Sequence, residues 1–151
     1  MKGSRGAAGF TMTELVAVLA LLGILVALAF TQWNGYLSQQ RLRHGIVQVA
    51  TDLRQAQERA KAERTPYTVI FTAASSAYTI ASSGGGFTEN TRLPDGVAAA
   101  AGETVTFSTF GQPVTSVTDA TPRAYIVTVQ NAAGRGTASV NATGGITYQA
   151  P

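Results

Sequence analysis

An uncharged apolar run near the N-terminus constrains this chain more than any other feature. No charged side chain occurs between Leu15 and Phe30, and extending the run back to Phe10 gives about 31 Å of helix, which matches the hydrocarbon core of a bilayer. Lys2 and Arg5 precede the run, so the positive-inside rule predicts a cytoplasmic N-terminus. The sequence therefore predicts a single transmembrane helix in the inner membrane, with the rest of the chain outside the cytoplasm.

The alternative hypothesis is a secretory signal peptide followed by a soluble β domain, with Ala27-Leu28-Ala29 as the cleavage site. Two features favour an anchor instead. Glu14 lies at the edge of the run, where a carboxylate costs about 2–3 kcal/mol in a bilayer. An amphipathic helical pattern also follows the run directly, as expected if the helix continues.

The residues from Gly9 to Leu15 combine a glycine, a phenylalanine and one acid at the start of the apolar run. This Gly-Phe-Thr-Met-Thr-Glu-Leu segment resembles the processing site of type IV prepilins and pseudopilins. The resemblance implies that prepilin peptidase cleaves between Gly9 and Phe10 and that the new amine of Phe10 is methylated. It also implies that Glu14, a carboxylate at membrane depth in need of a partner, pairs with the amine of a neighbouring subunit during assembly.

A helical pattern with one apolar stripe follows the membrane segment. The stripe, at spacings 4-3-4-3-4, consists of Leu42, Ile46, Val49, Leu53, Ala56 and Ala60. The polar face that we expect opposite to it consists of Arg41, Arg43, Asp52, Arg54, Glu58, Arg59, Lys61 and Glu63. Pro66 ends the pattern, so we expect one helix from Phe10 to Arg64, in which Gly23, Gly35 and Gly45 are candidate bends. Trp33 and Tyr36 suit either the membrane interface or packing under the head.

Beyond Pro66 the apolar pattern changes to the period of two that is typical of strands. The expected strands are Tyr67–Phe71, Ala77–Ala81, Glu103–Phe107, Ala124–Val129, Thr137–Val140 and Ile146–Tyr148. They predict an antiparallel meander whose apolar face is covered by the helix stripe. The predicted fold class is α+β.

Several segments make the resemblance more specific, towards the GspH/FimT branch of pilins and pseudopilins. They are Arg41-Leu42-Arg43, Asp52-Leu53-Arg54-Gln55-Ala56, Leu93-Pro94-Asp95-Gly96-Val97, Thr106-Phe107 with Gly111, and Gly144-Gly145-Ile146. Two departures are visible. Many type IV pilins have proline at the position of Thr31, and many close the C-terminus with a disulfide, which this cysteine-free chain cannot form. The second departure favours the minor-pilin branch.

This resemblance implies a domain organisation and a function. It implies a leader peptide over residues 1–9, a filament-core helix over 10–30, an amphipathic helix over 31–65 and an antiparallel β head over 66–151. The implied function is that of a structural subunit of a type IV pilus or a type II secretion pseudopilus. The implied partners are prepilin peptidase, other pilin or pseudopilin subunits, assembly platform proteins and membrane lipid.

The sequence shows no constellation of residues for catalysis, and we expect no enzyme, cofactor or metal. Without cysteine there is no thiolate ligand and no cysteine nucleophile. His44 is the sole histidine, and Glu89, Asp95 and Glu103 lack metal-ligand spacing. The Ser82–Gly86 segment is rich in glycine but lacks the lysine and following helix of a phosphate-binding loop.

The charge balance does not favour nucleic acid as a partner. Removing Lys2 and Arg5 with the leader leaves nine basic and eight acidic residues. The candidate for a weak DNA contact is Arg135, in an expected Gly134-Arg135-Gly136 turn. A minor pilin whose head captures DNA for natural transformation, or secreted protein cargo, is therefore the alternative function.

Overall fold

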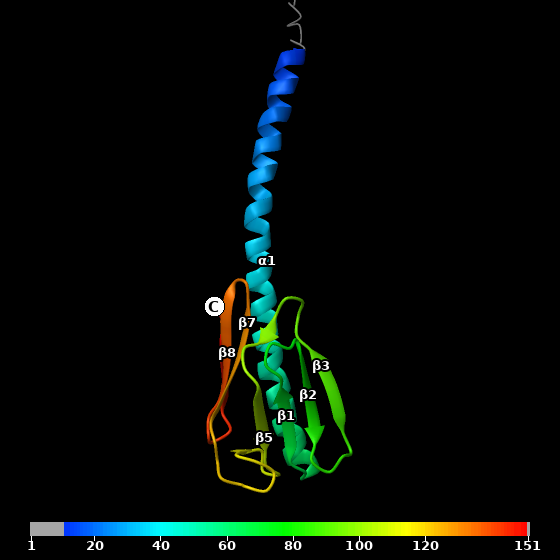
Figure 1. Cartoon of the computed structure of the whole chain (residues 1–151), viewed down its shortest axis with the longest axis vertical. Helices are drawn as coiled ribbons and strands as arrows, with labels where there is room; N and C mark the ends of the chain where they lie inside the picture. The colour runs from blue at the N-terminus through cyan, green and yellow to red at the C-terminus, as the bar shows by residue number, and fades with distance from the viewer. Residues whose placement is uncertain (1–10, 151) are drawn as a thin grey trace, which may run out of the picture. The chain divides into compact units, whose positions relative to one another are not determined.

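The computed structural model describes residues 11–150, with backbone alone at residues 29–32. Helix α1 (Met12–Glu63) is the one helix among these residues (Figure 1). The chain divides between Tyr36 and Leu37 into two compact units, an N-terminal unit and a head that includes the second half of α1. The observed helix agrees with the predicted one, and it continues through Gly23, Gly35 and Gly45. Phe10 lies outside the described residues.

The end of α1 follows the expected stop signal. Arg64 adopts a left-handed backbone conformation with φ of 52°, the conformation typical of the residue just after a helix. Pro66 follows and lacks the N–H group that another helical turn would need. The chain then enters the first strand at Tyr67.

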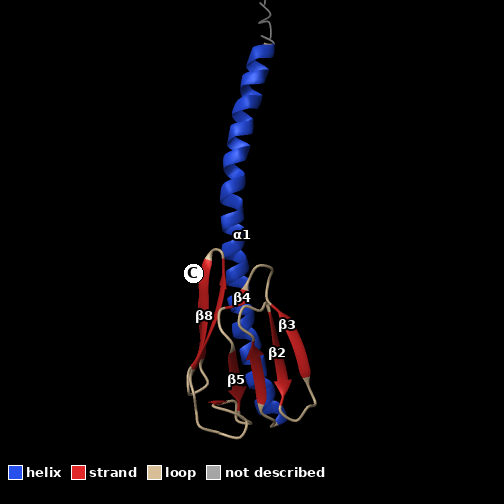
Figure 2. Ribbon diagram, in the orientation of Figure 1, coloured by secondary structure: helices blue, strands red, loops and turns tan. Residues whose placement is uncertain are grey.

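The head contains two antiparallel sheets. The first has the order β3-β2-β1-β5-β6, formed by β1 (Tyr67–Phe71), β2 (Ala77–Ser82), β3 (Thr88–Arg92), β5 (Glu103–Phe107) and β6 (Pro113–Val114). The second has the order β4-β7-β8-β9, formed by β4 (Ala98–Ala99), β7 (Tyr125–Asn131), β8 (Gly134–Val140) and β9 (Ile146–Gln149). Figure 2 shows the strands of both sheets alongside the C-terminal half of α1.

The predicted fold class, a long helix on an antiparallel β head, is confirmed, but the prediction of one meander is wrong. Strands β3, β4 and β6 were not expected. The side chains of β3 are polar and mostly exposed, and β4 and β6 have only two residues each, so none of them shows an alternating apolar pattern. The short β4 joins the second sheet by pairing with β7, while β5 pairs with β1 in the first.

The core forms where α1 meets both sheets. All six residues of the predicted stripe, Leu42, Ile46, Val49, Leu53, Ala56 and Ala60, are completely buried. In the first sheet, Val69 lies between Ile80 and Val105, and all three side chains are buried. In the second sheet, Val127 pairs with Ala138, and both are buried. Burial of each Val, Ile or Leu side chain contributes about 1.5–3 kcal/mol, so this interface accounts for most of the apolar burial in the head.

A buried glutamine links the helix to both sheets. Gln57 Nε2 donates to the carbonyl of Gly111, in the turn before β6, at 2.7 Å, and to the carbonyl of Gly144, in the turn before β9, at 2.9 Å. Gly144 has φ of 90°, and a Cβ there would lie 2.6 Å from the amide nitrogen of Gln57. Glycine at 144 is therefore required both by the backbone conformation and by the close approach of Gln57.

Replacing Gln57 with leucine tests this link. Leucine is of similar size but cannot donate, so Gln57→Leu leaves the carbonyls of Gly111 and Gly144 without their donor. We expect the free energy of unfolding to fall by about 1–3 kcal/mol for each unsatisfied carbonyl that stays buried. The measurement is chemical denaturation of the full chain in detergent, followed by circular dichroism. The control is Gln55→Leu, two residues away on the exposed face, and equal losses in the two variants would contradict the proposed role of Gln57.

Candidate functional site

The N-terminal unit presents apolar side chains outward. Residues Leu15, Val16, Val18, Leu19, Leu21, Leu22, Ile24, Leu25, Val26 and Leu28 are 45–66% exposed. The segment contains an 18-residue window of mean hydropathy 2.5 with none of its residues buried, so α1 is long and apolar enough to cross a membrane. Trp33 and Tyr36 are exposed as well. A helix that is apolar around its whole circumference is stable when lipid or other apolar helices surround it.

Thr11 caps the N-terminus of α1. Its hydroxyl oxygen Oγ1 accepts a hydrogen bond from the backbone N–H of Glu14 at 3.3 Å, and its carbonyl accepts one from the backbone N–H of Leu15 at 3.1 Å. Thr11 and Glu14 have the spacing of a capping box, in which a threonine precedes the helix and a glutamate ends its first turn. The Thr11 hydroxyl therefore satisfies the N–H group of Glu14, which has no acceptor within the helix. The Thr-x-x-Glu pattern of residues 11 to 14 is the sequence signal for this cap.

Glu14 is exposed in the first turn of the helix. A carboxylate is favourable at this position because the N-terminal end of a helix carries a partial positive charge. Among residues 11–150 the one ion pair joins Lys61 and Glu58, so Glu14 has no ion-pair partner within the described chain. Gly9 and Phe10, the predicted cleavage and methylation residues, lie outside the described residues.

The head contains a polar cluster of Asp52, Tyr78 and Gln48. Asp52 was assigned to the polar face of the helix, but it is half-buried and accepts a hydrogen bond from the hydroxyl of Tyr78. Gln48 Nε2 donates to the Tyr78 hydroxyl at 3.3 Å and to the carbonyl of Arg92 at 3.0 Å. The cluster therefore joins α1 to β2 and to the end of β3. The prediction of a solvent-facing Asp52 is wrong because Tyr78, on the buried face of β2, places its hydroxyl beside the edge of the apolar stripe of α1.

The environment of this cluster disfavours the ionised forms of its members. Burial raises the pKa of the Asp52 carboxyl above its ordinary value of 3.8, the hydrogen bond from Tyr78 opposes that rise, and the charge of Glu89 adds to it. Burial and the neighbouring Asp52 also raise the pKa of the Tyr78 hydroxyl. No histidine and no nucleophile joins these contacts, so the cluster has the chemistry of a structural link between helix and sheet.

Arg135 does not lie in a turn as expected. The β7–β8 turn consists of Ala132 and Ala133, and Arg135 is the second residue of β8, opposite Gln130. Strands β7 and β8 pair as far as Asn131 and Gly134, so the turn between them is shorter than predicted and Arg135 belongs to the strand. The side chain of Arg135 is nevertheless exposed.

The other two arginines after Pro66 lie on separate segments. Arg92 ends the edge strand β3, and the guanidinium of Arg123 lies 5.0 Å from the ring centroid of Tyr125. Within residues 11–150, no group of three or more His, Cys, Asp or Glu side chains is arranged to hold a metal ion. His44 is exposed on α1.

Comparisons with known proteins agree with the two units. Residues 4–30 match the family model for the prokaryotic N-terminal methylation motif. Among solved structures, the chain resembles the type IV minor pilin FimU of Pseudomonas aeruginosa strain PAO1, with a TM-score of 0.55 and 15% sequence identity. The similarity covers 77% of this chain and 96% of that chain. A comparison with curated proteins found no match.

These findings define the class of protein. The methylation motif overlaps the apolar part of α1, and 77% of the chain matches the fold of a pilin, with a long N-terminal helix whose second half packs on antiparallel sheets. The chain therefore combines the motif and the fold of a type IV pilin or pseudopilin. One individual protein with a similar fold is the minor pilin FimU.

The raised pKa of Asp52 predicts a pH dependence of stability. Because the folded state holds the Asp52 proton more tightly than the unfolded state does, the wild type loses stability as the pH rises from about 3.8 through the raised pKa. Asp52→Asn lacks this loss, so its stability relative to wild type should increase over the same interval. The measurement is the free energy of unfolding between about pH 2 and pH 8.

Asp119 provides a control of opposite sign. Hydrogen bonds from Thr121 lower the pKa of this exposed carboxyl, so Asp119→Asn should become less stable relative to wild type as the pH rises from the lowered pKa to about 3.8, and the difference should stay constant above that. A difference between Asp52→Asn and wild type that stays constant with pH would contradict the account of Asp52.

Proposed function

We propose that this chain is a structural subunit of a helical filament, either a type IV pilus or a type II secretion pseudopilus. The observation that carries the proposal is the exposed apolar segment of α1 with the methylation motif at its start. Before assembly, lipid of the inner membrane surrounds this segment and the head lies outside the cytoplasm. In the filament, the corresponding helices of other subunits replace the lipid, with assembly platform proteins as further partners.

Processing precedes assembly in this proposal. Prepilin peptidase removes residues 1–9 by cleavage between Gly9 and Phe10, and the amine of Phe10 is then methylated. The family match over residues 4–30 supports this step because it includes both sides of the cleaved bond. Glycine before the bond adds no side chain that would obstruct a narrow peptidase site.

Glu14 is proposed to act in assembly. Its carboxylate lies in the first turn of the helix and has no ion-pair partner among residues 11–150, and the Thr11 cap binds the backbone N–H of the same residue. The charged amine of Phe10 in a neighbouring subunit would supply a counter-charge at the same membrane depth. This pairing would set the axial register between adjacent helices.

The minor-pilin branch, GspH/FimT, is the more specific assignment that we favour. It is supported by the absence of cysteine and by the structural similarity to a minor pilin. The second candidate function, capture of DNA or of secreted protein by the head, is favoured by the exposed Arg135. Because Arg92, Arg123 and Arg135 lie on separate segments, we expect DNA affinity no better than about micromolar at physiological salt. Submicromolar binding of the full chain that is lost in Arg135→Ala would favour DNA capture instead.

The processing step predicts a defined mature mass. Protein purified from its native membrane should lack residues 1–9 and carry one added methyl group, as measured by intact mass spectrometry. Gly9→Leu should accumulate as the uncut precursor, while Gly6→Leu, within the leader, should be cut normally. An N-terminus immediately after Ala29 would instead establish the signal-peptide alternative.

The proposed role of Glu14 predicts an assembly defect without a folding defect. Glu14→Ala should reduce incorporation into filaments, because the amine of the neighbouring Phe10 loses its counter-charge. Thermal unfolding of the head should not change, because Glu14 belongs to the other compact unit. Glu14→Gln is the matched control, since it keeps the size and removes only the charge. Wild-type incorporation of both variants, quantified by immunoblotting of sheared filaments, would exclude this pairing.

A further inference from the structure

The charges of the head are distributed unevenly. Nine basic and seven acidic residues belong to the head, residues 37–151, since two basic residues and Glu14 precede it. Three of the nine, Arg41, Arg43 and Arg135, lie at the end of the head where α1 enters it, and we call them the arginine collar. The other six basic residues are Arg54, Arg59, Lys61, Arg64, Arg92 and Arg123, and six of the acidic residues are Asp52, Glu58, Glu63, Glu89, Glu103 and Asp119. These two sets cancel, so the net charge of the head comes from the collar end.

Two of the collar arginines belong to α1. Arg41 and Arg43 are the fifth and seventh residues of the head, which begins at Leu37. No charged residue occurs between Glu14 and Arg41. At about 100° of rotation per residue, the two arginines point in directions about 200° apart. They therefore lie on either side of Leu42, which is completely buried.

The third collar arginine reaches the same part of α1 from β8. On one side of Arg135, Asn131 donates from Nδ2 to the carbonyl of Ser38 at 2.6 Å. On the other side, Gly136 lies against α1, because a Cβ added there would be 3.4 Å from the Cβ of Ile46. The β7–β8 hairpin therefore runs beside α1 from Ser38 to Ile46, and Figure 1 shows its turn at the end of the head where α1 enters.

The collar arginines are available to a partner. All three are exposed. The one ion pair among residues 11–150 joins Lys61 and Glu58, so no collar arginine has an ion-pair partner in this part of the chain. One acid, Asp95, lies at the same end, since its neighbour Pro94 would be 3.5 Å from a Cβ added at Gly45. Three arginines and one aspartate leave a net charge of +2 at this end.

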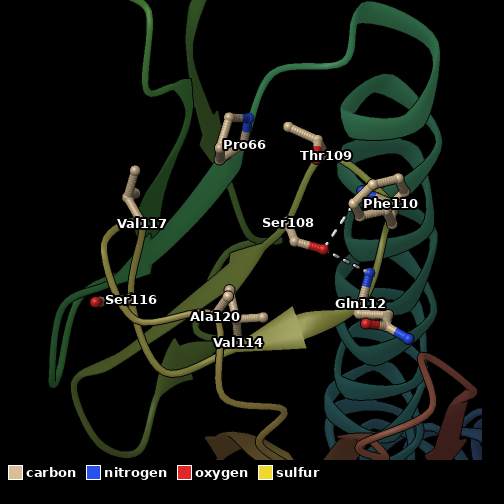
Figure 3. Close-up of a pocket in the computed structure, with 9 residues that line it drawn as sticks. All are labelled: Pro66, Ser108, Thr109, Phe110, Gln112, Val114, Ser116, Val117 and Ala120. Atoms are coloured by element: carbon tan, nitrogen blue, oxygen red, sulfur yellow. Dashed lines mark hydrogen bonds between the residues drawn. The ribbon is translucent and has the colours of Figure 1, made fainter.

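The opposite end of the head has a surface of another kind. Lys61 follows Arg41 by about 30 Å along α1, and near it Phe110 is 82% exposed. Phe110 borders a hollow of about 410 Å³, and the nine residues drawn around this hollow in Figure 3 are all uncharged. The two cations at that end of α1, Lys61 and Arg64, are matched by two glutamates in the same turns. An uncompensated positive charge therefore distinguishes the collar end.

The collar is close to the membrane segment because the chain between them is short. Five residues of polypeptide span at most about 18 Å, so Arg41 lies within this distance of Tyr36 at any angle between the two units. Trp33 and Tyr36 are exposed, and aromatic side chains of this kind are typical of the membrane interface. Lipid headgroups are therefore within reach of the collar when the apolar segment is in a bilayer.

The arrangement of the collar suits an extended anionic surface. Its arginines lie on different sides of α1 and on β8, so they do not converge on one point as the binding of a single compact anion requires. A surface of phosphate groups can meet each of them separately. The guanidinium group binds phosphate oxygens through paired hydrogen bonds, and all three members of the collar are arginine.

We propose that the arginine collar binds the phosphate groups of anionic phospholipids at the outer surface of the inner membrane. The contact holds one end of the head against the headgroups while the apolar segment of α1 is in the bilayer. It rests on the membrane-stored stage of the proposed function, and it specifies which lipid the head recognises and through which residues.

Reconstitution of the full chain in phosphatidylcholine vesicles tests this preference. Electron spin resonance of trace spin-labelled lipids gives the ratio of the association constants for phosphatidylglycerol and phosphatidylcholine. The collar variant is Arg41→Gln/Arg43→Gln/Arg135→Gln. The control variant, Lys61→Gln/Arg64→Gln/Arg123→Gln, removes the same charge from the other end of the head.

The ratio should fall at least about fivefold in the collar variant, since one arginine at an anionic surface contributes about fivefold. It should stay at the wild-type value in the control variant. The N-terminal cations are the same in all three chains, so the fall belongs to the collar. In wild type the preference should weaken at about 1 M salt, where the Debye length is about 3 Å.

A fluorescent label on the head provides a second measurement, because the chain has no cysteine of its own. Ala132→Cys places the label in the exposed β7–β8 turn, and Ala120→Cys places it in the exposed loop before β7. Nitroxides on the lipid headgroups should quench the label at residue 132 more strongly in vesicles that contain phosphatidylglycerol than in pure phosphatidylcholine. The label at residue 120 should show no such difference.

The outcomes separate the collar from the proposed function. Equal lipid ratios in wild type and the collar variant would overturn the collar, as would an equal fall in the control variant. Equal lipid ratios together with submicromolar binding of duplex DNA that the collar variant loses would assign the collar to DNA instead. A chain that passes both lipid tests but is absent from filaments would leave the collar standing and overturn the filament function. A soluble chain cut after Ala29 would overturn both.

Discussion

The packing of one apolar stripe of α1 against two sheets is the interaction on which the head depends. Its six residues, from Leu42 to Ala60, are completely buried and contact strands that are far apart in the sequence. Gln57 lies beside this stripe and ties one turn of each sheet to the helix. Without the helix, each sheet would expose its apolar face, because the two sheets have no strand in common.

The same helix has a different pattern before Tyr36, and this difference connects fold with function. In the head, apolar residues of α1 occupy one side and charged residues occupy the rest. In the N-terminal unit, apolar residues occupy the whole circumference and are exposed. A surface of this kind is unstable in water, so it requires lipid or other helices around it. A subunit that moves from a membrane into a filament meets this requirement at both stages.

Much of this organisation was predictable from sequence because it depends on regular patterns. The stripe, the helix end at Pro66 and strand β5 follow from periods of about 3.6 and 2 and from proline. Strands β3, β4 and β6 were not predictable, because they depend on pairing with strands already in place and not on their own composition. The hydrogen bond from Tyr78 to Asp52 and the exposure of Phe110 depend on which surfaces meet in three dimensions. Glu14 was identified from its motif, and the Thr11 cap could have been predicted as well, because Thr11 and Glu14 form the Thr-x-x-Glu pattern of a capping box.

The central claim is that the apolar segment of α1 serves to place the head in a filament. The most direct test is immunogold electron microscopy of filaments sheared from the native cells, with antibody raised against the head. We expect gold particles on the filaments, and we expect the remaining protein in the inner membrane. Unlabelled filaments, with the protein recovered entirely in the soluble periplasmic fraction, would contradict the account.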